Sequence, residues 1–172
     1  MSDPYALAEH VGEGRVCSAL AWAVVRGEQP LELGSIACSG DALFDLASLT
    51  KPLATVTAVA YLLETKALRL DDRVGDWLAE ARPDLGAATL ADLLHHRAGL
   101  LAFSEQLAAG LKGSPEQRIR ALRFRIVDLP LKHAPGRVVY SDLGFIVLAW
   151  ICQRAGAPVD GFRRREGLPH FV

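Results

Sequence analysis

Hydrophobic and polar positions follow two different patterns along this chain. Residues 16–25 form a short apolar run, which ends at a turn-rich stretch over residues 26–30, and a second short segment follows over residues 31–37. Two such runs about a turn predict a β-hairpin. From Ser48 onward the apolar runs lengthen, and residues 52–63 carry no charged side chain.

The long apolar stretch predicts a helix that begins close to Ser48. Pro52 is compatible with a helix only near its start, where the missing N–H would have no partner anyway. Because residues 52–63 are apolar on nearly every face, we expect this helix to be buried on all sides. A membrane span needs about 20 such residues, so this stretch indicates a core helix.

Later helices are predicted by their own start signals. Thr89 and Asp92 have the spacing of a capping box, and Ser114 is followed by Pro and, at the third position, Gln. Asp142 is expected to cap a last helix over residues 143–154. A hairpin followed by many helices predicts an α+β fold in which helix dominates.

Composition excludes several classes of protein. The chain is 51% hydrophobic and 23% charged, which is typical of a globular protein and not of a disordered one. The net charge of −1 argues against a nucleic-acid partner. Cys17, Cys38 and Cys152 are odd in number and widely spaced, so we interpret them as buried apolar residues in a reducing compartment. The acidic start does not resemble a secretory signal, so we expect a cytoplasmic protein without a membrane span.

Metal and cofactor motifs are missing from the sequence. His95 and His96 are adjacent, and on a helix they would point to different sides. There is no C-x-x-C, H-E-x-x-H, G-x-G-x-x-G or P-loop pattern. We therefore expect no metal and no cofactor.

Ser48 and Lys51 form an S-x-x-K motif at the start of the long helix. Residues three apart share a helix face, so the hydroxyl and the amine can meet. A lysine can take the serine proton if burial keeps the amine neutral, and the apolar helix favours that form. The alternative is that Ser48 is a plain helix cap and Lys51 a surface charge.

Tyr140 and Asp142 lie between a Pro-Gly turn and the last apolar helix. A tyrosine near an ammonium can relay a proton between a serine and a leaving group. The alternative is that Tyr140 is a half-buried aromatic residue and Asp142 only a cap.

Taken together, four segments resemble the serine β-lactamase-like superfamily, in the branch of class C β-lactamases, esterases and D-alanyl-D-alanine peptidases. The segments are FDLASLTKP (44–52), LRLDD (68–72), LADLLHHRAGL (90–100) and PGRVVYSDLGF (135–145). The resemblance implies that Ser48 is the acylated nucleophile, Lys51 its partner base and Tyr140 a proton shuttle. Asp142 falls where many members have an Asn that binds the substrate amide.

The resemblance also implies an architecture. It is a partial serine β-lactamase-like domain over residues 1–172, with a β-hairpin at about 16–37, a β-lactamase/transpeptidase-like helical lobe over 41–156, and an irregular tail over 157–172. No Lys- or His-Thr/Ser-Gly triplet follows Asp142. We therefore expect that the remaining sheet strands, which carry this third motif and the second oxyanion donor, are missing here.

Asp142 is a departure that affects the chemistry. A carboxylate at this place favours protonated Lys51, which cannot act as a base, and it cannot donate the hydrogen bond that Asn would. Asp142 therefore shifts the expected substrate from lactams towards esters. Ala98 is a milder departure, because relatives commonly have Ser before Gly99.

Three hypotheses about function remain open. The first is a serine hydrolase that acts through an acyl-enzyme on small ester or amide substrates, with β-lactams and D-Ala peptides included. The alternative is a catalytically inactive truncated lobe, which acts as a binding protein or has no function of its own, and which self-associates through its open sheet edge. The third is a helical interaction module without acyl chemistry.

Overall fold

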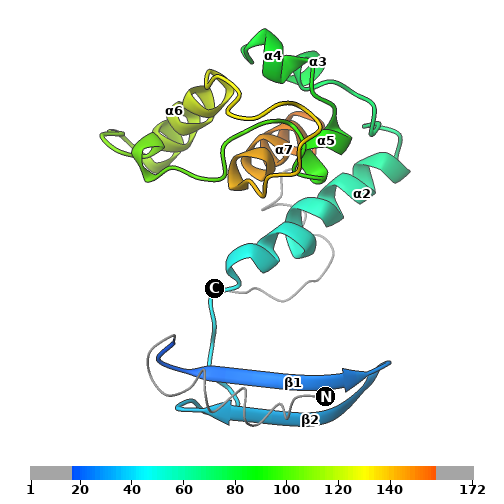
Figure 1. The fold of residues 1–172 in the computed structure, drawn as a ribbon, viewed down its shortest axis with the longest axis vertical. Helices are drawn as coiled ribbons and strands as arrows, with labels where there is room; N and C mark the ends of the chain where they lie inside the picture. The colour runs from blue at the N-terminus through cyan, green and yellow to red at the C-terminus, as the bar shows by residue number, and fades with distance from the viewer. Residues whose placement is uncertain (1–16, 158–172) are drawn as a thin grey trace. The chain divides into compact units, whose positions relative to one another are not determined.

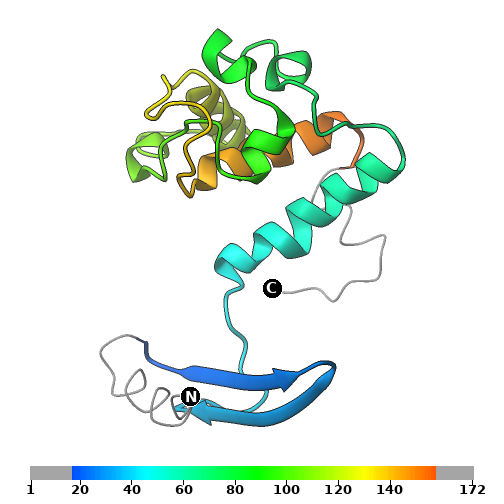
Figure 2. The same cartoon turned by 45° about the vertical axis from the view of Figure 1, so that its right-hand side comes forward.

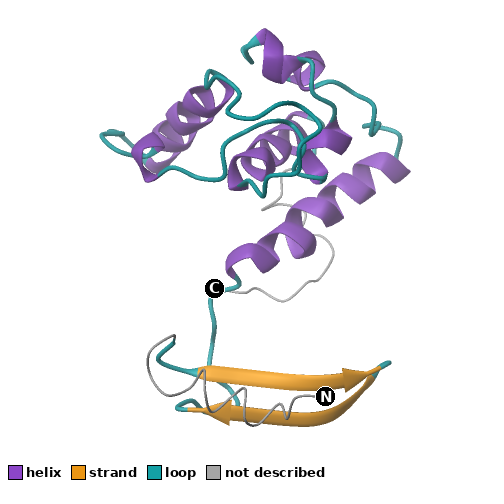
Figure 3. Cartoon of the chain, viewed as in Figure 1, coloured by secondary structure: helices purple, strands orange, loops and turns teal. Residues whose placement is uncertain are grey.

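A computed structural model of the protein describes residues 17–157, apart from the side chains of residues 30 and 31. The expected irregular tail, except residue 157, lies outside the described residues. The chain divides into two compact units, one up to Asp45 and one from Leu46 onward. Within the described residues the strands belong to the first unit and the helices to the second (Figure 1, Figure 3).

The first unit contains the predicted β-hairpin. Strands β1 (Leu20–Arg26) and β2 (Gln29–Ile36) pair antiparallel. The connecting turn uses Gly27 at φ +62°, a left-handed conformation that glycine adopts without steric cost. Trp22 lies across from Gly34, where any Cβ would fall 2.4 Å from the indole ring, so the large and the small residue fit as a pair. The prediction of a hairpin is confirmed.

The second unit is a lobe of mostly short helices, of which α6 and α7 are the longest at 13 residues each. In chain order they are η1 (Ala47–Leu49), η2 (Lys51–Val56), α2 (Thr57–Glu64), α3 (Val74–Trp77), α4 (Pro83–Gly86), α5 (Leu90–Leu94), η3 (Glu105–Leu107), α6 (Pro115–Val127) and α7 (Asp142–Arg154). Elements η1 and η3 are 3₁₀ turns, and η2 is a π-helical segment that runs directly into α2. The fold class is therefore α+β, as predicted.

Helix α7 provides the centre of the core. Leu143, Val147, Leu148 and Ile151 are at most 1% exposed. The helix packs against η2, α2, α3, α5 and α6, and Figure 2 shows these elements gathered about it. An uncharged run over residues 143–153 suits a helix that is covered on most sides. No helix in residues 17–157 is long and apolar enough to cross a membrane.

Two predicted helix starts are confirmed in detail. At α5, Thr89 Oγ1 accepts the Asp92 N–H and the Asp92 carboxylate accepts the Thr89 N–H, each at 3.1 Å. At α6, Ser114 Oγ accepts the Gln117 N–H at 3.3 Å and Gln117 Oε1 accepts the Ser114 N–H at 2.9 Å. These reciprocal bonds satisfy N–H groups that the helices themselves leave unpaired.

The expectation of a helix buried on all sides after Ser48 is wrong. Ala54, Ala58 and Leu62 are at most 2% exposed, but Leu53 is 44% and Val56 39% exposed. In the described chain, η2 and α2 pack against α7 along one face. The other face of this helix therefore presents apolar side chains outward.

The expected cap of the last helix is also corrected. Ser141 is the N-cap of α7, and its Oγ accepts the Gly144 N–H at 3.4 Å. Asp142 is the first residue of the helix. Its carboxylate is engaged elsewhere, in an ion pair with Lys51.

Candidate active site

Ser48 lies in the 3₁₀ turn η1, at the entrance to the long helix, and its side chain is exposed. The preceding residue, Ala47, has φ +43°, which is uncommon for a residue other than glycine. Conformations of this kind persist only where the surroundings impose them, and they cluster at functional sites. The unusual backbone therefore lies directly before the candidate nucleophile.

Lys51 begins η2 and reaches back to the serine. Its Nζ donates to Ser48 Oγ at 3.1 Å, as the spacing of three residues predicts. The Lys51 side chain is 14% exposed. Its ammonium also lies 4.8 Å from the centre of the Tyr140 ring and 5.7 Å from that of Phe145, so two aromatic faces help to hold a positive charge there.

Tyr140 approaches the same hydroxyl from the loop before α7. Its hydroxyl donates to Ser48 Oγ at 2.7 Å, although the two residues are 92 positions apart. Ser48 Oγ thus accepts hydrogen bonds from both Lys51 and Tyr140. The fold brings together the three residues that the sequence analysis selected as catalytic.

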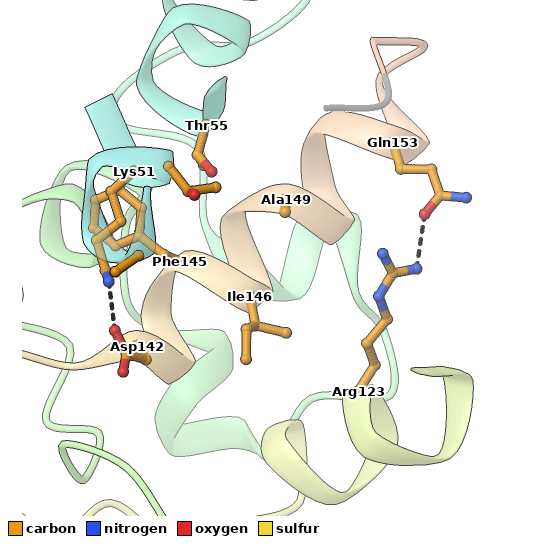
Figure 4. Close-up of a pocket in the computed structure, with 10 residues that line it drawn as sticks. Lys51, Thr55, Arg123, Asp142, Phe145, Ile146, Ala149 and Gln153 are labelled. Atoms are coloured by element: carbon orange, nitrogen blue, oxygen red, sulfur yellow. Dashed lines mark hydrogen bonds and ion pairs between the residues drawn. The ribbon is translucent and has the colours of Figure 1, made fainter. Parts of the chain in front are cut away.

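Asp142 joins the cluster from the first turn of α7. Its Oδ1 accepts a hydrogen bond from Lys51 Nζ in a short ion pair (Figure 4). The four predicted site residues, Ser48, Lys51, Tyr140 and Asp142, therefore form one contiguous group. The alternative of Ser48 as a helix cap is not supported, because η1 and η2 have no side-chain cap hydrogen bond.

The pKa values of Lys51 and Tyr140 are shifted in opposite directions. Burial lowers the pKa of Lys51, but hydrogen bonds and charge from Asp142 and Tyr140 outweigh it, so the pKa is raised overall. The pKa of Tyr140 is lowered by hydrogen bonds with Lys51 and Ser48. The expectation that burial makes the Lys51 amine neutral is therefore wrong. The other expectation, that the Asp142 carboxylate favours protonated Lys51, agrees with the raised pKa.

The segment that carries Tyr140 is bound to the segment after α5. The Ser141 hydroxyl donates to the Leu101 carbonyl at 2.7 Å, and the Asp142 N–H donates to the Ala102 carbonyl at 3.0 Å. Ser141 is 3% exposed, so its hydroxyl is satisfied inside the protein. Sequence reasoning missed these contacts, because a serine between two candidate site residues carries no signal of what it binds.

A pocket of about 360 Å³ opens beside the ion pair. Lys51 and Asp142 line one end, and Ile146 lies on its floor along α7 (Figure 4). At the far end Arg123 donates to Gln153 Oε1 at 2.7 Å. The pocket offers an apolar surface between polar ends next to the candidate catalytic group.

No group of three or more His, Cys, Asp or Glu side chains in residues 17–157 could hold a metal ion. His95 places its Nδ1 2.7 Å from the Ala91 carbonyl of its own helix. His96 instead faces the ring of Tyr140. His10 and His170 lie outside the described residues.

Comparison with known proteins identifies relatives of this chain. The chain is 31% identical over 145 residues to an Escherichia coli K12 protein whose name assigns it provisionally to D-alanyl-D-alanine carboxypeptidase, with 76% of this chain and 33% of that protein covered. The chain thus spans about a third of the length of the curated relatives that it matches.

Solved structures share the fold. The class C beta lactamase from Rhodobacter sphaeroides matches with a TM-score of 0.66 and 26% identity, over 90% of this chain and 44% of that one. The D-amino acid amidase from Ochrobactrum anthropi SV3 matches with a TM-score of 0.68 and 26% identity, over 92% and 50%. A family model described as Beta-lactamase matches residues 6–164. This chain therefore belongs to the beta-lactamase family.

Proposed function

We propose that this chain carries the acylation site of a serine hydrolase that acts on small ester or amide substrates. Ser48 is the nucleophile, Tyr140 its general base, and Lys51 the cation that favours ionised Tyr140. One observation carries the proposal: Ser48 Oγ lies within hydrogen-bond distance of both Lys51 Nζ and Tyr140 Oη. The site belongs to the lobe predicted over residues 41–156.

The charge distribution supports this division of roles. With its pKa raised, Lys51 is an ammonium at neutral pH and has no lone pair with which to take a proton. Tyr140 has a lowered pKa and lies 2.7 Å from the hydroxyl that must lose its proton. A base needs this proximity first and a suitable pKa second.

The proposed reaction has two halves. Ionised Tyr140 takes the Ser48 proton as Oγ attacks the carbonyl carbon, and the Ser48 N–H stabilises the resulting oxyanion. The Tyr140 hydroxyl then gives this proton to the departing alcohol or amine, which leaves an acyl group on Ser48. In the second half, Tyr140 takes a proton from water as the water oxygen attacks the acyl-enzyme ester. It gives this proton to Ser48 Oγ as the bond to the acyl group breaks, which releases the acid and restores the starting state.

The substrate class follows from Asp142. Its carboxylate accepts from Lys51 and has no N–H to offer to an amide carbonyl of the substrate. Esters need no such donor, so we propose them ahead of β-lactams and of the D-alanyl peptides that the names of relatives suggest. The adjoining pocket supports a small apolar acyl group beside Lys51.

Covalent labelling tests the proposal. The protein is incubated with a fluorophosphonate, and its intact mass and peptides are measured. We expect one adduct, on Ser48, that is lost in Ser48→Ala and retained in Ser104→Ala, with circular dichroism to establish that each variant is folded. Folded protein that takes no label, or equal labelling of Ser48→Ala, would refute the proposal.

A second candidate function is binding to another chain. Leu53 and Val56 expose apolar surface on the η2–α2 helix, and Leu33 is 70% exposed in the hairpin. Exposed apolar groups and a two-stranded sheet both favour association. Sedimentation velocity over a range of concentrations tests this: a monomer at the highest concentration removes self-association as a function.

A further inference from the structure

His96 binds the backbone on both sides of Tyr140. Its carbonyl accepts the Val139 N–H at 2.9 Å, and its Nδ1 accepts the Ser141 N–H at 3.1 Å. Because the two bonds join the residues immediately before and after Tyr140 to one histidine, they limit how far the tyrosine can move. Both donor–acceptor distances are ordinary for hydrogen bonds in proteins.

The imidazole ring of His96 also contacts the phenol. Ring centres of His96 and Tyr140 lie 4.6 Å apart at an interplanar angle of 37°. The imidazole also contacts Phe145, with ring centres 5.2 Å apart at an interplanar angle of 33°. His96 thus contacts both a buried aromatic residue and the exposed ring that reaches Ser48.

The bond to Ser141 fixes the protonation state of the ring. A nitrogen that accepts an N–H carries no proton, so His96 is neutral with its proton on Nε2. Burial and the nearby Lys51 charge lower the pKa of His96, which preserves this form at neutral pH. The His96 Nδ1 can therefore accept the Ser141 N–H at neutral pH.

We propose that His96 is a positioning residue, whose Nδ1 and carbonyl hold the Tyr140 hydroxyl at Ser48 Oγ. This inference rests on the proposed function, in which Tyr140 moves the serine proton. His96 does not contact Ser48 in this arrangement and acts through Tyr140. Misplacement of a catalytic group by about 1 Å can cost about 100-fold in rate, so small losses of alignment are measurable.

Substitutions at His96 can separate the acceptor from the ring. The backbone of His96 has φ +57°, which asparagine tolerates well. His96→Asn places an amide oxygen where Nδ1 lies, whereas His96→Gln carries its amide one methylene further out. His96→Phe keeps an aromatic ring without an acceptor.

The experiment measures the rate of Ser48 labelling by a fluorophosphonate in these variants. We expect His96→Asn to stay within about 3-fold of the parent, and His96→Gln and His96→Phe to fall about 10- to 100-fold. The matched control is His95→Phe, which changes an adjacent exposed histidine whose Nδ1 contacts the Ala91 carbonyl of its own helix, and it should leave the rate unchanged.

A second measurement does not depend on activity. The ¹³Cζ resonance of Tyr140, assigned by its loss in Tyr140→Phe, is titrated in each folded variant. We expect the lowered pKa of Tyr140 to persist in His96→Asn and to move up towards its ordinary value in His96→Gln and His96→Phe. If folded His96→Gln has the same Tyr140 pKa and the same rate of Ser48 labelling as the parent, the inference is overturned.

The two measurements distinguish two kinds of failure. If Ser48 takes no label in the parent, the proposed function fails, while the titration of Tyr140 still decides whether His96 positions it. If Ser48 is labelled and every His96 variant behaves as the parent does, the function stands and the positioning role is rejected.

Discussion

Lys51 and Asp142 form an ion pair between the first residue of η2 and the first residue of α7, across 91 positions of sequence. The Lys51 side chain is 14% exposed and that of Asp142 40%. A carboxylate this close stabilises the ammonium, so it ties the protonation of the site to the packing of the two helices. The pair also binds the start of the S-x-x-K helix to the helix that follows Tyr140.

Asp142→Asn should lower the pKa of Lys51. The substitution removes a charge that, together with Tyr140, outweighs burial, and burial alone favours the neutral amine. The ¹³Cε resonance of Lys51, assigned with Lys51→Arg, should therefore titrate at lower pH in the variant than in the parent. An unchanged titration would show that Asp142 does not hold the charge on Lys51.

The same ion pair predicts how stability depends on pH. The pKa of Lys51 is raised above its ordinary value of 10.5, so the stabilisation is complete below that pH and is lost as the pH rises through the folded value. The difference in unfolding free energy between parent and Asp142→Asn, below about 1 kcal/mol for a partly exposed pair, should be constant from pH 7 to 9. This difference in unfolding free energy should shrink above pH 10.5, which urea unfolding at each pH can measure. A difference that grows above pH 10.5 would contradict the raised pKa of Lys51.

Tyr140→Phe should slow the labelling of Ser48 by about 100- to 10,000-fold, the usual contribution of a general base. Tyr140 is 51% exposed, so removing its hydroxyl should leave the thermal midpoint nearly unchanged. Tyr61→Phe, at 42% exposure on α2, is the matched control and should label at the parental rate. Equal rates for the two variants would remove Tyr140 from the mechanism.

Gly99→Ala should destabilise the protein more than Gly136→Ala. Both glycines have positive φ, +80° and +90°, and forcing alanine there costs about 1–2 kcal/mol. A Cβ on Gly99 would also lie 2.5 Å from the His133 carbonyl oxygen, whereas nothing lies within 4 Å of one on Gly136. Urea unfolding followed by circular dichroism should give a difference of about 1–3 kcal/mol between the variants. Equal losses of stability in the two variants would mean that the loop at Gly99 moves to accept the added Cβ without further cost.

Cys152 should resist thiol reagents in the folded protein. It is fully buried in α7, and burial raises the pKa of its thiol to about 11. At pH 8 only about one molecule in a thousand would carry the reactive thiolate. Cys17 and Cys38 are partly exposed, which corrects the expectation that all three cysteines are buried. Mass spectrometry after brief alkylation should find Cys152 modified only in denaturant.

Local signals in the sequence predicted the parts of the fold that depend on local chemistry. The capping boxes at Thr89 and Ser114 form because each side chain satisfies a backbone group within three residues. The contact between Ser48 and Lys51 follows from helical spacing in the same way. The approach of Tyr140 to these residues is long-range, and only the combined resemblance of four segments predicted it.

Interactions between distant segments escaped prediction. His96 was considered only as a metal ligand, because its bond to Ser141 depends on a backbone meeting that no spacing encodes. The net charge of Lys51 depends on which of two opposing effects is larger, and this needs the position of the Asp142 carboxylate. The exposed face of the η2–α2 helix depends on what packs against it, which apolar composition cannot specify.

The π-helical segment Lys51–Val56 has a consequence for how this family member could be altered. A π turn holds one residue more than an α turn, and here Thr57 Oγ1 donates to the Pro52 carbonyl five positions back. Removing one residue between Pro52 and Val56 would therefore let the segment rewind as regular α-helix with Lys51 close to its present orientation relative to α2. The same deletion within the regular helix α2 would instead turn Lys51 by about 100° relative to the end of that helix, and so away from Asp142 on α7. The place of a deletion, and not only the number of residues removed, thus decides whether the proton network survives.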